Sequence, residues 1–224
     1  MSKKAVLIVS GGMDSVTLAH YFHAKRYDLT LLSFDYGQRH VKELQFAKAC
    51  ADRLGGIHKI VDLHSVTALL PGSSLTDSSV EVPEGHYAAE SMKVTVVPNR
   101  NAIMLAIAWA HAVAIGAEAV AFGAHAGDHF IYPDCRPEFF NAISNAFRKG
   151  NEGFGNPNLK LYAPFIDFTK AQVADLGREM GVHFEETWSC YNGREKHCGK
   201  CGTCVERKEA FALAGIVDPT EYEE

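Results

Sequence analysis

Residues 6–15 constrain the fold of this chain more than any other part of the sequence. The first four of them are apolar and three are β-branched, a pattern that predicts a strand buried on both faces of a parallel sheet. Residues 10–12, Ser-Gly-Gly, predict a sharp turn, and Asp14 and Ser15 can cap and open the helix that follows. Because glycine lets backbone N–H groups approach an oxyanion and a helix N-terminus favours negative charge, the stretch predicts a phosphate-binding turn in an α/β fold.

The side chains of this turn favour a nucleotide site over an ordinary strand-to-helix connection with a serine cap. Ser10 and Ser15 add hydroxyl donors, and Asp14 is compatible with a phosphate when Mg²⁺ lies between them. The turn is not of the G-x-x-x-x-G-K-[ST] type, because no lysine closes it and that spacing occurs nowhere in the chain. The string S-G-G-x-D-S resembles the PP-loop of the ATP pyrophosphatase superfamily, whose members hold the pyrophosphate of ATP and cleave between its α- and β-phosphates. We therefore expect ATP to be bound by Ser10, Gly11, Gly12, Met13, Asp14 and Ser15.

The rest of the chain alternates strand and helix patterns. Strands are predicted at 4–9, 29–34, 59–63, 120–123 and 161–165, and helices at 14–25, 44–54, 99–115, 138–148 and 170–180. The alternation predicts an α/β fold with a doubly wound, mainly parallel, five-stranded Rossmann-like sheet. A short edge strand is expected at 94–97, and the turn-rich segment 71–93 is expected to be a long loop or a lid.

Charge and hydropathy exclude several classes of protein. The formal net charge is −5 and the sequence pI is about 6.1, so a small-molecule partner is favoured over DNA or RNA. The longest apolar run, 102–115, is interrupted by His111 and is too short to span a bilayer. The N-terminal residues lead into the first predicted strand without a signal-peptide pattern. We therefore expect a cytoplasmic protein with no nucleic-acid or membrane partner.

The C-terminal region carries a predicted metal site. Four cysteines with knuckle spacing match the donor number of a tetrahedral site: Cys190, Cys198, Cys201 and Cys204. Four thiolates in a reducing compartment favour Zn²⁺, and an iron–sulfur cluster is the alternative. His197 is expected beside the ligands rather than among them. We expect an ATP-binding domain over 1–182 and a small C-terminal zinc-binding subdomain over 183–224, in which the metal is structural.

Polar segments follow three of the predicted strands, at 10–15, 35–40 and 124–136. Ligands of an open parallel sheet bind beyond the carboxyl ends of the strands, so these segments are expected to surround one pocket. Gly37 suits a backbone that passes close to an adenine. Arg39 can meet a phosphate or a carboxylate with two N–H groups, although a solvated polar loop is the alternative.

Two cations are expected near the phosphates. Arg100, followed by Asn101, begins an otherwise apolar helix, where the helix dipole would favour an acidic residue. An arginine at that position indicates a bound anion, unless it is an ordinary exposed first-turn residue. Lys170 follows the predicted cap Thr169 and can reach over the phosphates in place of the missing loop lysine, unless it too is an ordinary first-turn residue.

Segment 124–136 combines two histidines, two aspartates and an arginine at a strand end. A carboxylate in this position can accept hydrogen bonds from the ring N–H groups of a purine-like base, and Tyr132 or Phe139 can stack on that base. The two histidines are alternatively metal ligands. Cys135 is either a nucleophile beside His129 or a packed core residue.

Several motifs together resemble the 7-cyano-7-deazaguanine synthase family of the queuosine pathway along nearly the whole chain. They are residues 10–15, 34–40, 98–101, 132–139 and the four-cysteine tail. The resemblance implies an adenine nucleotide alpha hydrolase-like fold and a ligase that converts 7-carboxy-7-deazaguanine and free ammonia to the nitrile with ATP and Mg²⁺. It also implies one bound Zn²⁺ and a homodimer. Ala126 and Gly127 depart from the more polar pair expected before Asp128, so this loop follows the family less closely than the ATP turn does.

The motifs and the resemblance give each site residue an expected role. Catalysis is expected from Asp14, Ser15 and Lys170. Beyond the phosphate turn, ATP contacts are expected from Phe34, Gly37, Arg39, Arg100 and Asn101. The substrate is expected at Asp128, Tyr132, Asp134, Arg136 and Phe139. A tRNA-thiolating enzyme of the same superfamily, with catalytic cysteines, and a non-catalytic zinc- and nucleotide-binding module are the alternative functions.

Overall fold

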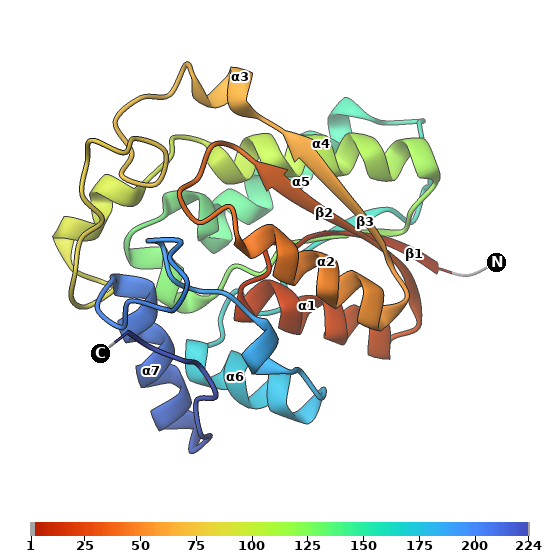
Figure 1. Ribbon diagram of the computed structural model, residues 1–224. Coiled ribbons are helices and arrows are strands. Elements are labelled where there is room, and N and C mark those ends of the chain that lie inside the picture. The colour runs from red at the N-terminus through yellow and green to blue at the C-terminus, as the bar shows by residue number, and fades with distance from the viewer. Residues whose placement is uncertain (1–2, 224) are drawn as a thin grey trace.

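The computed structural model describes residues 3–223 and contains one five-stranded sheet (Figure 1). The strands are β1 (Lys3–Ile8), β2 (Tyr27–Asp35), β3 (Ile57–Asp62), β4 (Ala119–Ala121) and β5 (Lys160–Tyr162). Their order across the sheet is β3-β2-β1-β4-β5, and every neighbouring pair is parallel. The predicted parallel five-stranded sheet is therefore confirmed. The order reverses beside β1, which places the turn after β1 at the point where ligands of such sheets bind.

Helices cover both faces of the sheet. They are α1 (Met13–Ala24), α2 (Glu43–Leu54), α3 (His64–Thr67), α4 (Arg100–Ile115), α5 (Pro137–Gly150), α6 (Lys170–Glu179) and α7 (Gly202–Ala214). Short 3₁₀ helices lie at η1 (Glu90–Thr95), η2 (Ala126–Phe130), η3 (Pro133–Cys135) and η4 (Phe184–Glu186). Figure 1 shows α4 and α5 on one face and α1, α2, α6 and α7 on the other. The doubly wound prediction is therefore correct.

Strand β1 separates two hydrophobic clusters because its side chains point alternately to the two faces. Val6 belongs to the cluster that contains Leu105 of α4, whereas Leu7 belongs to the cluster that contains Leu18 of α1. All four of these residues are 0% exposed. This burial on both faces explains the continuous apolar run of the first strand and holds the following turn on a rigid base.

The edge strand predicted at 94–97 is wrong. Residues Glu90–Thr95 form the 3₁₀ helix η1. The Thr95 hydroxyl donates to the carbonyl of Met92 at 2.7 Å, and Val96 N–H donates to the carbonyl of Lys93 at 3.1 Å. The second bond uses a backbone N–H that an edge strand over 94–97 would need, and the Met92 side chain of the same helix is 1% exposed.

Segment 71–93 is the expected long connection, and it packs across the carboxyl ends of the strands. Gly85 N–H donates to the carbonyl of Lys200 at 3.0 Å, and Tyr87 O–H donates to Asp128 at 3.0 Å. The segment therefore joins the C-terminal region to the loop after β4. Whether it moves as a lid stays a prediction.

The C-terminal region shares a core with the rest of the chain. Phe184 and Phe211 pack edge to face with ring centroids 4.9 Å apart, and both belong to the cluster formed by β1, α1 and α6. The boundary expected between 182 and 183 stays a prediction. Within residues 3–223, no helix is long and apolar enough to cross a membrane.

Candidate active site

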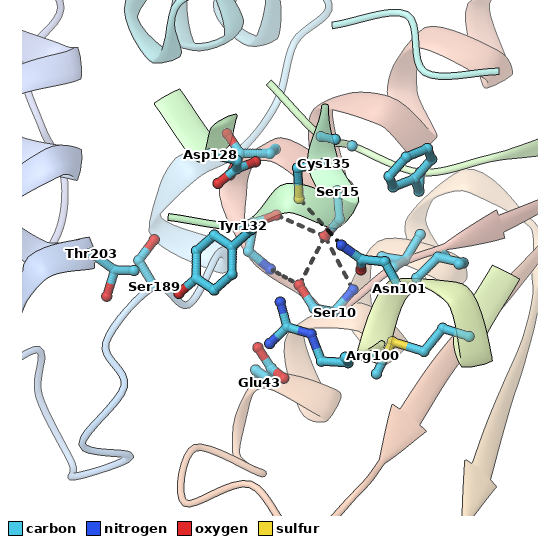
Figure 2. A pocket seen from close by; sticks show the side chains of 18 of the residues that line it. Ser10, Ser15, Glu43, Arg100, Asn101, Asp128, Tyr132, Cys135, Ser189 and Thr203 are labelled. Atoms are coloured by element: carbon cyan, nitrogen blue, oxygen red, sulfur yellow. Dashed lines mark hydrogen bonds between the residues drawn. The ribbon is translucent and has the colours of Figure 1, made fainter. Parts of the chain in front are cut away.

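A pocket lies beyond the carboxyl ends of β1, β2 and β4 (Figure 2). Its empty space of about 1100 Å³ includes the solvent at its open mouth. Ile8, Phe34, Met104 and Phe122 line an apolar part, while charged and hydroxyl groups line the remainder. The pocket therefore combines an apolar wall with convergent polar groups, the usual make-up of a small-molecule site.

The turn after β1 gathers backbone N–H groups at one point. Ser10 N–H and Gly11 N–H both donate to the Ser15 hydroxyl oxygen at 3.2 Å, and that hydroxyl donates to the carbonyl of Gly12 at 3.0 Å. Gly11 has φ +101°, and a Cβ there would overlap the carbonyl oxygen of Glu43 and lie 2.9 Å from the backbone nitrogen of Ala47. The Ser15 hydroxyl therefore marks the point on which these N–H groups converge at a helix N-terminus, and such a point is suited to an anion.

Lys170 stands at the centre of a buried charge cluster next to this turn. Its Nζ lies 2.9 Å from Asp14 Oδ2, 3.0 Å from Glu206 Oε2 and 3.3 Å from His125 Nε2. Burial disfavours the ammonium, but the carboxylates of Asp14 and Glu206 outweigh it and hold the pKa of Lys170 above its ordinary value. Burial likewise raises the pKa of Asp14, yet the neighbouring ammonium leaves it below its ordinary value. Lys170 is therefore a fixed positive charge beside the phosphate turn.

Glu206 belongs to this charge cluster, although the sequence did not indicate it as a site residue. It lies on α7 and is 8% exposed, and α7 packs along α6, which Lys170 begins. Gly127 lies against this carboxylate, because a Cβ there would be 2.8 Å from Glu206 Oε1 and 2.9 Å from His125 Cε1. This contact explains one of the two unusual small residues before Asp128. The sequence signal for Glu206 is an acidic residue on the buried side of a helix, and this signal does not identify Lys170 as its partner.

The four predicted metal ligands form one buried cluster, here called the cysteine cluster: Cys190, Cys198, Cys201 and Cys204. All four sulfur atoms lie within 4.8 Å of one another. The Cys198 and Cys204 sulfurs are 3.9 Å apart, close to the separation of about 3.8 Å that a tetrahedral site with Zn–S bonds of about 2.3 Å requires. His197 Nε2 accepts a hydrogen bond from Ser189 N–H at 3.0 Å, which places this ring beside the cluster as expected. The cluster can bind zinc.

The cysteine cluster is joined to the pocket by short covalent and hydrogen-bonded links. Cys201 is the N-cap of α7, and the same helix carries Thr203, which lines the pocket, and Glu206. Trp188 N–H donates to the carbonyl of Gly11 at 2.9 Å. A metal at the cluster would therefore hold the start of α7 and the segment that supports the phosphate turn.

The structure brings most of the predicted site residues together. Those that line the pocket are Ser10, Gly12, Asp14, Ser15, Phe34, Arg100, Asn101, Asp128, Tyr132 and Lys170. Gly11 and Met13 belong to the turn, with Met13 pointing into the core at 0% exposed.

Other predicted residues are directed elsewhere by local contacts. The Arg39 guanidinium donates to the carbonyls of Asp77 and Val80 at 2.6 and 2.5 Å. It therefore stabilises segment 71–93 and does not face the pocket. Gly37 lies against the ring of His64, because a Cβ there would be 3.5 Å from its Cδ2 atom. Both lie outside the pocket lining within residues 3–223.

Three predicted substrate contacts are likewise placed away from the pocket lining of the described chain. Asp134 Oδ2 accepts a hydrogen bond from Asn101 N–H at 3.0 Å at the start of α4. Arg136 Nε donates to the carbonyl of His129 at 2.8 Å, and Phe139 packs against the cluster of α4. Each side chain stabilises the loop or helix that carries it.

Cys135 lines the pocket as a packed thiol. Burial raises its pKa well above the ordinary value, and Asn101 Nδ2 donates to its sulfur at 3.2 Å. A raised pKa disfavours the thiolate, so the geometry supports the packing role over the nucleophile. The alternative metal role of the histidines gains no support, because the metal-compatible group found in residues 3–223 is the cysteine cluster.

The pocket also contains residues that the sequence did not single out as ligands: Tyr36, His40, Glu43, Tyr87, Trp188, Ser189, Tyr191 and Thr203. Glu43 begins α2 directly after the polar segment at the end of β2, and burial raises its pKa to about 8. Burial also lowers the pKa of His40 to about 3, so its ring is neutral. No residue-spacing signal pointed to Glu43, because its position depends on how α2 packs on the phosphate turn.

Arg100 is a cation without an anion. Its Nη1 donates to the Tyr36 hydroxyl at 3.4 Å, and its guanidinium carbon lies 5.7 Å from the Tyr132 ring centre and 5.9 Å from the Tyr36 ring centre. No carboxylate of residues 3–223 lies within 4.0 Å of it. A guanidinium held in an aromatic setting and left without a counter-ion is suited to an anionic ligand, as the sequence indicated.

Comparison with known proteins identifies the family and the fold of this chain. The family model described as "Queuosine biosynthesis protein QueC" matches residues 4–215. Curated relatives named 7-cyano-7-deazaguanine synthase, from Brucella ovis and Brucella suis, are each 58% identical over 221 residues, covering 99% of this chain and 94% of theirs. The solved structure of NMN synthetase from Francisella tularensis aligns with a TM-score of 0.52 at 15% identity, covering 96% of this chain and 79% of that one, and so shares the fold.

Proposed function

This chain belongs to the family of the queuosine biosynthesis protein QueC, and from this premise we propose that it converts 7-carboxy-7-deazaguanine and ammonia to 7-cyano-7-deazaguanine with ATP. The observation that carries the proposal is one pocket that combines a phosphate cradle, a fixed ammonium at Lys170 and an unpaired guanidinium at Arg100. The cradle suits the phosphates of ATP, and the guanidinium suits the acid group of a second ligand. Family membership favours this function over the thiolating and non-catalytic alternatives.

The chemistry requires two activations, because a carboxylate is a poor electrophile. In the first, a substrate carboxylate oxygen attacks the α-phosphorus of ATP, pyrophosphate leaves, and ammonia then displaces AMP to give the amide. In the second, the amide oxygen attacks the α-phosphorus of another ATP. Loss of AMP and two protons from the activated amide gives the nitrile. Each step needs precise alignment of phosphate and acid, and stabilisation of the departing pyrophosphate.

The residues of this chain supply those two requirements. The N–H groups of Ser10 and Gly11, with the Ser15 hydroxyl, are placed to bind the β- and γ-phosphates. Lys170 is placed to stabilise the charge that develops on the leaving pyrophosphate. The apolar part of the pocket, which includes Phe34, is suited to the adenine.

Two metal ions belong to the proposal. Within the described chain, Asp14 Oδ1 is buried and has no hydrogen-bond partner, so this carboxylate oxygen fits a Mg²⁺ ligand beside the phosphates. Mg²⁺ would neutralise phosphate charge there. The cysteine cluster supplies four sulfur ligands for a structural Zn²⁺, as its geometry fits that ion.

The remaining partners are proposed from the family resemblance. Free ammonia is the nitrogen donor, the enzyme works in the cytoplasm, and two copies form a homodimer.

An assay with ATP, ammonia and 7-carboxy-7-deazaguanine tests the proposed function. We expect the zinc-loaded protein to form the nitrile, detected by mass spectrometry, and ³¹P NMR to show AMP and pyrophosphate. ADP as the sole nucleotide product would remove the adenylate mechanism. Binding of ATP without any nitrile would favour a nucleotide-binding module instead.

A further inference from the structure

The carboxylates that line the pocket are those of Asp14, Glu43 and Asp128, and they differ in which oxygens the protein already bonds. Asp128 accepts hydrogen bonds from the Tyr87 hydroxyl at 3.0 Å and from His125 N–H at 3.2 Å. Asp14 is paired with Lys170 through Oδ2, and its free Oδ1 is the oxygen proposed for Mg²⁺. Glu43 Oε2 also has no hydrogen-bond partner in residues 3–223. Glu43 therefore has an oxygen left for an organic ligand, because the free oxygen of Asp14 is taken by the proposed metal.

Glu43 is held rigidly, so its free oxygen is fixed in direction. Its Oε1 accepts a hydrogen bond from Gln38 Nε2 at 3.3 Å and lies 3.6 Å from His40 Nε2. Its backbone carbonyl lies against Gly11. Only 7% of the residue is exposed, and this burial raises the pKa of the carboxyl to about 8, as expected for an acid with too few donors around it.

Glu43 and Arg100 face the same end of the pocket but do not form an ion pair. Figure 2 shows the two side chains close together in the view, on the side of Ser10 away from Asp128. No N–O distance of 4.0 Å or less joins them, although Arg100 lowers the pKa of Glu43 through its charge. A carboxyl group and a guanidinium that the fold holds apart in one cavity offer adjacent acceptor and donor positions to a ligand.

We propose that Glu43 and Arg100 form the subsite that recognises the edge of a guanine-like ring: Glu43 accepts from the ring N1–H and the exocyclic amine, and Arg100 donates to O6 and the carboxylate at C7. The inference rests on the proposed function and adds the residues that select its substrate. In this assignment Glu43 takes the substrate-binding role that the sequence predicted for Asp134 and Asp128. Asp134 accepts a hydrogen bond at the start of α4, and both oxygens of Asp128 already accept hydrogen bonds from the protein.

The chemistry of this pair excludes adenine as its ligand. A guanine-like ring presents two adjacent donors followed by an acceptor, whereas adenine presents an amine beside a ring acceptor. A carboxylate can accept from both guanine-type donors, and arginine pairs with two neighbouring acceptors in the geometry it uses for guanine O6 and N7. The adenine of ATP would leave Glu43 only half bonded, so it belongs in the apolar part of the pocket.

Equilibrium binding of 7-carboxy-7-deazaguanine and of the same molecule without its exocyclic amine tests the subsite. We expect the unaltered protein to bind the amino compound roughly 10- to 100-fold more tightly, because the amine satisfies a buried acceptor. In Glu43→Gln this preference should fall to within about threefold, while the Kd of ATP is unchanged. Asp52→Asn, which removes an exposed carboxylate from the same helix, is the matched control and should keep the preference.

Arg100→Lys tests the other half of the subsite. Because lysine lacks the planar pair of donors, we expect the Kd of 7-carboxy-7-deazaguanine to rise roughly 10-fold or more with little change in the Kd of ATP. A larger effect on ATP would mean that Arg100 binds a phosphate and would overturn its assignment to the ring and its carboxylate.

Several results would overturn the inference while leaving the proposed function intact. The inference would be overturned if the unaltered protein makes the nitrile but binds both ring compounds equally, and this measurement does not depend on the folding of any variant. A folded Glu43→Gln protein with undiminished preference would overturn it too. If Glu43→Gln does not fold, Glu43→Asp serves in its place, and an unchanged preference there has the same meaning. Failure of the unaltered protein to form any nitrile would instead count against the proposed function.

Discussion

Replacing Gly11 with alanine is predicted to separate the phosphate turn from helix α2. The backbone of Gly11 has φ +101°, and an added Cβ would overlap the carbonyl oxygen of Glu43. It would also lie 2.9 Å from the nitrogen of Ala47, 0.5 Å short of the 3.4 Å at which ordinary contact begins (3.4 − 2.9). Both neighbours are helix backbone, which cannot rotate away as a flexible side chain can.

The expected cost has two parts. An L-residue in a left-handed conformation costs about 1–2 kcal/mol. Forcing a methyl group into packed backbone costs about another 1–3 kcal/mol, which gives roughly 2–5 kcal/mol in total. Gly55→Ala is the matched control, because Gly55 also has positive φ, +66°, but a Cβ there meets no atom within 4 Å. Gly55→Ala should therefore cost only the first part, about 1–2 kcal/mol.

Urea unfolding at fixed zinc concentration, followed by tryptophan fluorescence, measures the difference between the two variants. We expect Gly11→Ala to lose more free energy of unfolding than Gly55→Ala and to weaken ATP binding, which Gly55→Ala should leave unchanged. Equal losses of stability with equal ATP affinity would refute the claim that the phosphate turn is wedged against α2.

Three further predictions follow from the charges and the metal ligands. Lys170→Met should lower the free energy of unfolding by about 3–5 kcal/mol, because it leaves Asp14 and Glu206 buried without their shared cation; urea unfolding checks this, and a loss below 1 kcal/mol would contradict it. The pKa of Glu43 in the folded protein, about 8, lies above the ordinary glutamate value of 4.5, so its contribution to stability is fully present below pH 4.5 and is lost as pH rises through 8. As pH rises from 4.5 to 8, the thermal midpoint of Glu43→Gln should therefore fall less than that of the unaltered protein. Parallel plots of thermal midpoint against pH for the two proteins would contradict the raised pKa of Glu43. Removal of metal from the cysteine cluster by a chelator should lower the thermal midpoint and release one equivalent of zinc, whereas an iron signal in the elemental analysis would contradict the zinc assignment.

The sequence was most informative where function depends on residues that are consecutive or regularly spaced. The phosphate turn could be predicted because residues 10–15 make their own hydrogen bonds, and the cysteine cluster because its ligand spacing is local. The parallel sheet followed from the apolar runs and from the helices between them. Each of these features is determined within a short segment of the chain.

The sequence was least informative where a side chain's partner lies far away in the chain. Arg39 was expected at the phosphates, but the carbonyls of Asp77 and Val80 take its guanidinium. Glu206 meets Lys170 only because α7 packs on α6. Glu43 enters the pocket only because α2 packs on the phosphate turn. Long-range packing decides these contacts, and no local pattern records it.

The initial rate of nitrile formation by Ser15→Ala tests the central claim most directly, because this hydroxyl is the point on which the N–H groups of Ser10 and Gly11 converge. If the turn after β1 holds the phosphates of ATP in position for attack, the folded, zinc-loaded variant should be slower by roughly 100-fold. A rate equal to that of the unaltered protein would contradict the account.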